Sequence, residues 1–409
     1  MNPLLSMAFR NVARNRRRSL ITLGAIIIGI GAVGTVRGVL NGLQDAIIKG
    51  TVEGTIGALQ VHRTGYMANV MSTPLSLDFE ATDALLAKIK AVEGVTAVAP
   101  RIQFAGTLTM TTESQEEAPE ALFFAAVAVD PVLEPKVCPQ RLKLFTDGTR
   151  LDDEHLVLGD ALARSFDAKR GAEAVLLAPD KDGSLNGELA KVGGEMRAIM
   201  PGEMKIAVVP LGMAQRLLRM DGRITELAIG IDDLDQVSRI ADDLRATLGP
   251  DFEVHAWDQL APERKTIMNI QNGISGIVAT VFLVLMLLGV ANTMLMSVLE
   301  RTREVGTMMA VGLTRGAVLT LILLEALVMG LLGAAGGFLL TAGVTSALAA
   351  RGLHFMPPNA TMEIEIIPYM GPRFTLAVML AAVLGAVLFA LYPALRASRL
   401  RPVQALAGR

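Results

Sequence analysis

Residues 292–325 read N292TMLMSVLERTREVGTMMAVGLTRGAVLTLILLE325. Most of their charges gather in the short interval Glu300–Arg315, and long apolar runs, Gly273–Leu299 and Gly316–Ala350, lie on either side of it. Glu325 is the only charged residue in either run. Because about 20 apolar residues span the hydrocarbon core of a bilayer as a helix, the stretch predicts two membrane helices joined by a charged segment.

The charged segment itself has helical spacing. Glu304, Met308 and Val311 lie at i, i+4 and i+7 and share a face, and Gly312 favours a helix end before a restart near Thr314. A helix that leaves the bilayer, turns in water and re-enters offers a surface on which a cytosolic protein can push. An ordinary connector between membrane helices has the same composition, so spacing alone leaves both interpretations open.

The whole chain is too apolar for an ordinary soluble protein, with 52% hydrophobic residues and a mean hydropathy of +0.46. Four windows predict membrane helices: Ser19–Leu40, Gly273–Leu299, Gly316–Thr341 and Phe374–Leu395. The residues between the first two windows are polar and number about 230, enough for a soluble domain with its own core.

Charge predicts the orientation of these helices. Residues 1–19, the 300–315 segment and the tail after Leu395 together carry 12 Lys and Arg against two acids. Residues 41–268 carry 35 Asp and Glu against 23 Lys and Arg. The positive-inside rule therefore puts both termini and the 300–315 segment in the cytoplasm and the large domain outside.

Residues 4–18 form a basic amphipathic stretch that predicts a helix lying in the inner headgroup layer. The same stretch has the composition of a signal-peptide n-region, with a small-residue cleavage site ending at Gly34 as the alternative. The first membrane helix has no strong break before about Gly50, and the second extends back to about Pro262. Two over-long helices predict a stalk that continues past the bilayer.

Two features inside the membrane segments are candidates for helix contacts. Glycines recur at four-residue spacing, which favours close helix packing, although glycine is common in membrane helices generally; they are Gly34, Gly38 and Gly42 in the first helix and Gly333 and Gly337 in the third. Glu325 is an intramembrane carboxylate. With no second intramembrane acid or histidine, a structural ion or hydrogen-bond contact is favoured over proton relay.

The large domain predicts a mixed α+β fold, in one or two lobes. Strands are expected at Ala58–His62, Leu108–Thr111, Leu122–Val129, Val175–Ala178, Ile206–Val209, Glu226–Ile231 and Phe252–Ala256, and helices at Thr82–Val92, Asp160–Phe166, Gly212–Met220 and Leu234–Leu248. Glu113–Glu120 and Asp180–Met204 have the composition of loops.

The sequence contains no catalytic motif. It has no G-x-x-x-x-G-K-[ST] phosphate loop, no G-x-S-x-G and no H-E-x-x-H, and its single cysteine, Cys138, and four histidines lack metal-ligand spacing. We therefore predict a non-catalytic membrane subunit without cofactor, metal or nucleic-acid partner, driven by the energy of another protein.

Several segments resemble the FtsX/MacB-type ABC transporter permeases, a group that includes macrolide-exporter and lipoprotein-releasing (LolC/LolE) permeases. The resemblance is carried by the 292–315 segment with Glu325 and G330LLGAAGG337, by R10NVARNRRRSLITLGAIIIGIG31, by G94VTAVAPRIQFAGTL108 and by Y392PALRASRLRP402. It implies a separate ABC ATPase, a second permease copy or paralogue, and a periplasmic carrier or adaptor as partners. It also implies a multi-pass protein of the inner (plasma) membrane, in contact with its phospholipids, with a periplasmic domain that is moved from the cytoplasmic side.

The resulting organisation has nine segments: a cytoplasmic basic helix (1–18), helix 1 and stalk (19–44), an extracytoplasmic MacB-like domain (45–265), stalk and helix 2 (266–299), a coupling segment (300–315), helix 3 (316–350), an external loop (351–373), helix 4 (374–395) and a cytoplasmic tail (396–409).

In the coupling segment Met308 and Met309 are expected to seat in the ATPase with Arg303 and Glu304 at the rim; the remaining candidates are Glu300, Arg301, Gly312 and Arg315. Lipoprotein or lipid-linked cargo release is the favoured activity. The alternatives are a MacB-like exporter of small amphiphiles and a division-type regulator of a cell-wall hydrolase.

Overall fold

The computed structural model describes residues 3–14, 16–111, 121–197, 205–356 and 361–399. The chain divides into two compact units. The helical unit comprises Met1–Gln44, Ile267–Leu353 and Ile366–Arg409, and the sheet unit comprises Asp45–Thr266 with His354–Glu365. The loop expected at Glu113–Glu120 and the last ten residues of the predicted tail lie outside the described residues.

In the described part of the chain, four helices are long and apolar enough to cross a membrane. They are α2 (Arg16–Thr51), α10 (Pro262–Glu300), α12 (Arg315–Arg351) and α13 (Pro372–Ser398). Each contains one of the four apolar windows of the sequence. With 36 and 39 residues, α2 and α10 are about 54 and 58 Å long, well beyond a hydrocarbon core of about 30 Å.

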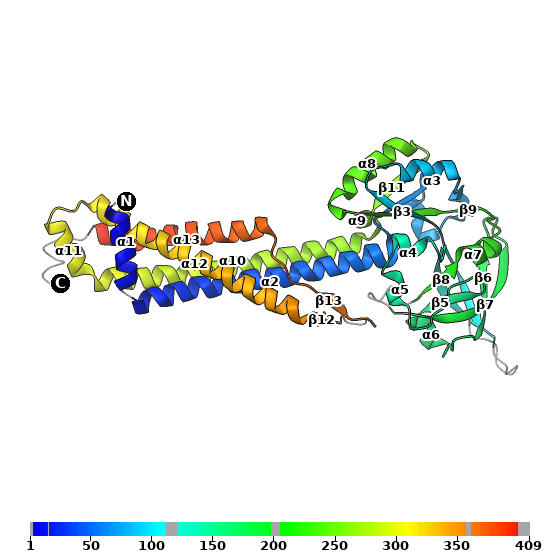
Figure 1. Ribbon diagram of the computed structural model, residues 1–409, viewed down its shortest axis with the longest axis horizontal. Helices are drawn as coiled ribbons and strands as arrows, with labels where there is room; N and C mark the ends of the chain where they lie inside the picture. Colours follow the sequence, from blue (N-terminus) through cyan, green and yellow to red (C-terminus); the bar gives the residue numbers. More distant parts are fainter. Residues whose placement is uncertain (1–2, 15, 112–120, 198–204, 357–360, 400–409) are drawn as a thin grey trace. The chain divides into compact units, whose positions relative to one another are not determined.

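The helical unit is held together by apolar side chains where these four helices meet. Ile26 and Ile30 of α2 pack with Met286 and Val290 of α10, and small side chains of α12 and α13 fill the same core. Two shorter helices, α1 (Pro3–Arg14) and α11 (Thr302–Ala310), complete the unit. Figure 1 shows α1 lying across the bundle near the end where α11 joins α10 to α12.

The sheet unit is built on one large sheet with the strand order β11-β1-β10-β3-β4-β8-β5-β7-β6. Its strands are β1 (Leu59–Arg63), β3 (Val95–Met110), β4 (Ala121–Val129), β5 (His155–Gly159), β6 (Glu173–Pro179), β7 (Leu185–Met196), β8 (Ile206–Pro210), β10 (Glu226–Ile231) and β11 (Phe252–Ala256). β6 also pairs with β3, so the strands from β3 to β6 close into a ring. The pairs β4–β8 and β5–β7 are parallel, and the other pairs are antiparallel.

Helices cover the open part of this sheet. α3 (Asp83–Lys90) and α8 (Val237–Leu248) lie side by side on one face, where Ile89, Ile240 and Leu244 are buried (Figure 1). The remaining elements are short: η1 (Val52–Ile56), η2 (Met67–Ser72), η3 (Leu75–Leu77), β2 (Phe79–Glu80), α4 (Glu134–Val137), α5 (Arg141–Leu144), α6 (Asp160–Ser165), α7 (Leu211–Leu218), β9 (Arg223–Ile224), η5 (Leu234–Gln236), α9 (Trp257–Leu260), β12 (Leu353–Phe355) and β13 (Ile364–Ile366).

The mixed α+β class predicted for the large domain is confirmed, but the prediction of a loop over Asp180–Met204 is wrong for the twelve residues Leu185–Met196, which form β7. Ala190 and Val192 on this strand are buried, and residues 198–204 of the predicted loop lie outside the described residues. The glycines that suggested a loop are needed for close packing: a Cβ at Gly193 or Gly194 would clash with Arg150 or Thr149. β3 begins well before the expected strand Leu108–Thr111. Arg101, a buried charged residue in its middle, interrupts the apolar pattern by which a strand is predicted.

Candidate functional site

The charged segment between α10 and α12 folds as the short helix α11, bounded by two breaks. At Arg301 the backbone leaves the helical region (φ −101°, ψ 14°), which separates α11 from α10. At the other end Gly312 has a φ of +108°, a conformation that glycine adopts without steric cost. Thr314 then caps α12, since its side chain accepts a hydrogen bond from the backbone N–H of Ala317 at 3.3 Å. The predicted helix, stop and restart are therefore all present.

Arg301 links α11 to α12. Its Nε donates to Glu304 Oε2 at 2.9 Å and its Nη1 donates to Glu325 Oε1 at 3.3 Å. The Arg301 side chain is only 14% exposed and that of Glu325 only 10%. Burial alone would lower the pKa of Arg301, but the hydrogen bond to Glu304 and the charge of Glu325 outweigh burial and raise this pKa. The guanidinium is therefore held in its charged form between two carboxylates.

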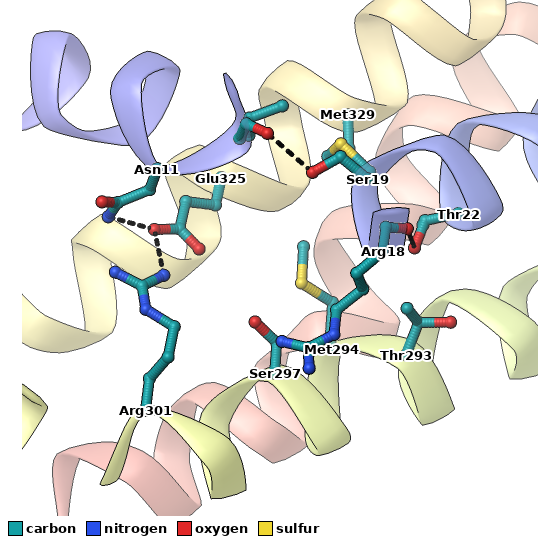
Figure 2. Close-up of a pocket in the computed structure, with 11 residues that line it drawn as sticks. Asn11, Arg18, Ser19, Thr22, Thr293, Met294, Ser297, Arg301, Glu325 and Met329 are labelled. Carbon is teal, nitrogen blue, oxygen red and sulfur yellow. Dashed lines mark hydrogen bonds and ion pairs between the residues drawn. The ribbon is translucent and has the colours of Figure 1, made fainter. Parts of the chain in front are cut away.

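The N-terminal helix α1 reaches the same two carboxylates. Asn11 Nδ2 donates to Glu325 Oε1 at 2.6 Å, and Figure 2 shows Asn11 and Arg301 converging on that oxygen from different helices. Arg14 Nη2 lies 2.7 Å from both carboxylate oxygens of Glu304. The hydrogen bond from Arg301, followed by the charges of Arg301 and Arg14, lowers the pKa of Glu304. Glu325 therefore makes the structural contacts that the sequence favours over proton relay.

A further ion pair joins Arg18, in the first turns of α2, to Glu300 at the end of α10. We call the seven residues that connect α1, α2, α10, α11 and α12 the polar network: Asn11, Arg14, Arg18, Glu300, Arg301, Glu304 and Glu325. Its acids and arginines alternate, so each carboxylate of the network has a cationic partner. The network ties the α11 segment to the ends of three long helices.

Beside the polar network is a small cavity of about 30 Å³. It is lined by Asn11, Val12, Arg18, Ser19, Thr22, Thr293, Met294, Ser297, Arg301, Glu325 and Met329 (Figure 2). Such a volume accommodates about one water molecule. It is far too small for a nucleotide or for a transported molecule, so the network fits a mechanical role better than a binding role.

The other residues of the coupling segment include both half-buried and exposed side chains. Met308 and Met309 are half-buried and pack against Val298, Val305 and Val318 of the same chain. They are part of the internal core because α11 turns its apolar face toward its own neighbouring helices. Val311 is the exposed apolar side chain of the segment, at 85%. Arg303, Gly312 and Arg315 are also exposed.

The glycines of α2 and α12 lie where the helices approach one another. Added Cβ atoms at Gly34 and Gly38 would lie 2.6 and 3.0 Å from side-chain atoms of Thr341 and Thr345. One at Gly337 would lie 2.6 Å from Ile30 Cβ. Similarly, a Cβ at Gly333 would clash with the side chain of Ile26, and one at Gly42 with the carbonyl oxygen of Ile367. These positions leave no room for a side chain unless a neighbour moves.

Sequence reasoning missed two sets of residues. It did not foresee that α1 packs on its own chain: Ala8 is fully buried, and Asn11 and Arg14 contact α12 and α11. It also missed Arg101 in the sheet unit, whose guanidinium is buried against Glu134 (2.6 Å) and Glu226 (3.0 Å).

The buried cluster around Arg101 holds the segment that follows α2. Arg101 donates to the carbonyl oxygen of Ile56 at 3.2 Å, and Arg141 donates to that of Thr55. Arg141 is paired with Glu134 at 3.0 Å. Carbonyl groups at the end of a helix lack intrahelical hydrogen-bond donors, and here two arginine side chains donate hydrogen bonds to them. Among the described residues no group of three or more His, Cys, Asp or Glu is placed to hold a metal ion.

Comparisons with known proteins agree with this architecture. Residues 19–247 match the family described as MacB-like periplasmic core domain, and residues 276–402 match the family described as FtsX-like permease C-terminal. An uncharacterized ABC transporter permease of Methanocaldococcus jannaschii is 22% identical over 100% of this chain and 98% of its own length. The ABC transporter permease YknZ of Bacillus subtilis is 23% identical over 98% of both chains.

A macrolide export ATP-binding/permease protein MacB of Hyphomonas neptunium is 31% identical, over 50% of this chain and 30% of its own length. Among solved structures, the periplasmic region of MacB from Actinobacillus actinomycetemcomitans aligns with 55% of this chain and 98% of its own, at 11% identity and a TM-score of 0.36. Because one family match covers more than half of the chain, this protein belongs to the ABC transporter permeases that combine a MacB-like periplasmic core domain with an FtsX-like C-terminal region.

Proposed function

We propose that this chain is a non-catalytic permease subunit that relays ATP-driven motion from a separate ABC ATPase to its sheet unit. The observation that carries the proposal is the polar network, in which Arg301 joins α11 to α12 and Arg14 and Asn11 join both to α1. A push on α11 is then shared among these helices rather than absorbed by a loose loop. The given sequence contains no phosphate loop, which supports the proposal that a partner supplies the energy.

The exposed surface of the α11 segment is the proposed docking site for the ATPase. Val311 is an exposed apolar side chain of this segment, and Arg303 and Arg315 are exposed charged residues of the same segment. A protein interface commonly combines an apolar anchor with a polar rim, and these residue types match that composition. Met308 and Met309, which the sequence analysis expects to seat in the ATPase, are half-buried against apolar side chains of this chain, so we propose Val311 as the more accessible anchor.

We further propose that the sheet unit is periplasmic and acts on a small amphiphilic cargo. Two of the relatives are named as macrolide exporters, and macrolides are small amphiphiles. Their names therefore favour a small amphiphile over a lipoprotein as the cargo. Orientation rests on the arginine excess of residues 1–19 and 300–315. Both α2 and α10 are long enough to cross the bilayer and continue beyond it.

The docking proposal is tested by co-purification with the cognate ATPase. Val311→Asp puts a charge in the proposed apolar contact and should weaken ATPase binding at least about 30-fold, as expected for loss of an anchor worth about 2 kcal/mol. Val132→Asp is the matched control, since Val132 is a 71% exposed valine of the sheet unit. Equal ATPase retention by both variants would show that α11 is an ordinary connector.

A further inference from the structure

An apolar cavity of about 210 Å³ lies between α2, α10 and α13 in the helical unit. Its walls include Ile30 and Val33 of α2, Leu283 of α10 and Val378 of α13. Thr280 is the one polar residue among the described residues that line it, and the Thr280 hydroxyl donates to a backbone carbonyl of α10 at 2.8 Å. The cavity therefore offers apolar contacts and no free hydrogen-bond donor of its own.

The cavity follows the helices for about two turns. At one end α2 and α10 are in close contact, since a Cβ built at Gly29 would lie 3.1 Å from Met286 Sδ. From Met286 the lining of α10 extends back to Ala279, which is seven residues or about 10 Å along the helix. Apolar cavities exclude water, and one of about 150 Å³ binds benzene. The space therefore suits a section of a hydrocarbon chain.

A guanidinium group lies beyond the other end of the cavity. Arg37 follows Val33 by one turn on the same face of α2, and its Cζ is 5.4 Å from the centre of the Phe374 ring. Phe374 in turn precedes Val378 by one turn on α13. Arg37 Nη1 also donates to Asn272 Oδ1 of α10 at 2.7 Å. The three helices that line the cavity therefore also hold this guanidinium.

Arg37 lies at the level of the lipid headgroups and lacks an anionic partner. Arg18 of the polar network and Arg37 are 19 residues apart on α2, about 28 Å, which is close to the hydrocarbon thickness of about 30 Å. Arg37 Nε is buried and has no hydrogen-bond partner among the described residues. No described carboxylate forms an ion pair with Arg37 or with its exposed neighbour across the bundle, Arg373. The boundary therefore carries unpaired positive charge beside an apolar cavity.

We propose that a membrane glycerophospholipid binds here, with one acyl chain in the cavity and its phosphate at Arg37. A planar guanidinium matches phosphate because parallel N–H groups donate to two of its oxygens. The acyl chain fills the apolar space, and the phosphate supplies the missing negative charge at headgroup level. The lipid comes from the leaflet on the Arg37 side, the outer leaflet in the orientation proposed above. The site is separate from the polar network and does not depend on the ATPase or cargo assigned above.

Lipid binding to the purified full-length chain, titrated in detergent and measured by native mass spectrometry, tests the proposal. The probes are phosphatidylglycerol, diacylglycerol with the same acyl chains, and glycerophosphoglycerol, which is the headgroup without chains. The unchanged chain should bind one phosphatidylglycerol at least about 10-fold more tightly than diacylglycerol, as expected for hydrogen bonds from a charged group. Equal affinity for these two lipids would remove the phosphate from the site, and competition by glycerophosphoglycerol would show a phosphate site without a lipid chain.

The position of the acyl chain is tested by filling the cavity. Ala279→Leu combined with Ala381→Leu should weaken the binding of both lipids at least about 10-fold, because several methylene groups of the lipid lose their buried site. Ala335→Leu is the matched control, since Ala335 is exposed on α12 and does not line the cavity. Unchanged lipid binding by the filled variant, or an equal loss in the control, would show that the chain does not occupy this cavity.

The role of the guanidinium is tested by the preference between the two lipids. Arg37→Gln should lower the affinity for phosphatidylglycerol to that for diacylglycerol and leave the latter unchanged, whereas a purely structural role would lower both alike. Arg37→Lys keeps the charge and should recover part of the preference. Arg351→Gln is the control, because Arg351 is an exposed arginine at the end of α12. An undiminished preference for phosphatidylglycerol in Arg37→Gln would overturn the proposal.

Discussion

The guanidinium of Arg301 donates a hydrogen bond to the carboxylate of Glu325 at 3.3 Å, and this contact joins the α11 segment to the membrane helix α12. Arg301 also bonds Glu304 on α11 itself, at 2.9 Å. Through this residue a displacement of α11 is applied directly to α12. Without Arg301, Asn11 would be the remaining hydrogen-bond partner of the buried Glu325 carboxylate among the residues that the structure describes.

Truncating Arg301 should therefore destabilise the protein far more than truncating Arg14, although both bond Glu304. Arg301→Ala should cost about 1.5–3 kcal/mol, the usual value for a hydrogen bond to a charged group with little solvent access. The Arg14–Glu304 pair is 57% and 49% exposed, so Arg14→Ala should cost less than about 1 kcal/mol. Thermal unfolding in detergent, followed by far-ultraviolet circular dichroism, measures both. Equal shifts in the unfolding midpoint for the two variants would contradict the conclusion that the Arg301 contacts, being more buried, contribute more stability than the Arg14–Glu304 pair.

Glycine substitutions distinguish close helix contacts from open helix surface. Gly42→Ala should destabilise the protein by about 1–3 kcal/mol, because the added Cβ would clash with the backbone carbonyl of Ile367, which cannot rotate away. Gly343→Ala is the control: nothing lies within 4 Å of its Cβ position, so the variant should be neutral or up to about 1 kcal/mol more stable. The same thermal measurement applies, and a stabilising Gly42→Ala would rule out the packing described here.

The buried carboxylate Glu134 predicts a loss of stability in acid. Burial would raise the pKa of Glu134, but the charge of Arg101 and then that of Arg141 outweigh burial and lower this pKa below its ordinary value. A carboxyl group whose folded-state pKa is depressed stabilises the fold at a pH above its unfolded-state pKa, about 4.3. This contribution is lost as the pH falls from there through the folded-state pKa.

Trp257 is the only tryptophan and lies in the sheet unit, so its fluorescence reports on unfolding of that unit. Glu134→Gln should destabilise the unit by about 3–5 kcal/mol at neutral pH, since two buried arginines lose a partner. Its stability should also depend less on pH below about 4.3 than that of the unchanged protein. Parallel acid profiles for the two proteins would mean that Glu134 is not the group that titrates.

Orientation is tested with single cysteines at Ser184 and Thr314, both exposed. In intact spheroplasts a membrane-impermeant maleimide should label position 184 and leave position 314 unlabelled until the membrane is opened. Native Cys138 is buried and should give little background. Labelling of 314 alone would reverse the proposed topology.

Much of this architecture could be predicted from residue patterns. Membrane helices depend on local composition, so runs such as Gly273–Leu299 were sufficient to locate them. The helix end at Gly312 and the helix cap at Thr314 were both predicted correctly. Each depends on the residue type itself, because glycine adopts a positive φ and a threonine hydroxyl accepts a hydrogen bond from the first turn of a helix. The strands Glu226–Ile231 and Phe252–Ala256 were predictable because their apolar residues are consecutive or alternate.

What could not be predicted depends on contacts between distant residues. Asn11 and Glu325 are 314 positions apart, and nothing near either residue indicates the other. The burial of Arg101 could not be predicted, because its partners Glu134 and Glu226 come from other elements. The packing of Met308 and Met309 on Val298, Val305 and Val318 could not be predicted either, because helical spacing defines a face without showing which neighbour lies beside it.

The central claim is that the polar network transmits the action of the ATPase, and ATP hydrolysis by the reconstituted complex tests it most directly. The isolated chain should hydrolyse no ATP above background. With the cognate ATPase in liposomes, the unchanged chain should alter the rate of hydrolysis, and Arg14→Ala should behave nearly the same. Arg301→Ala should bind the ATPase with unchanged affinity but lose most of that effect on the rate. Full retention of the effect by Arg301→Ala, at equal ATPase binding, would contradict the account.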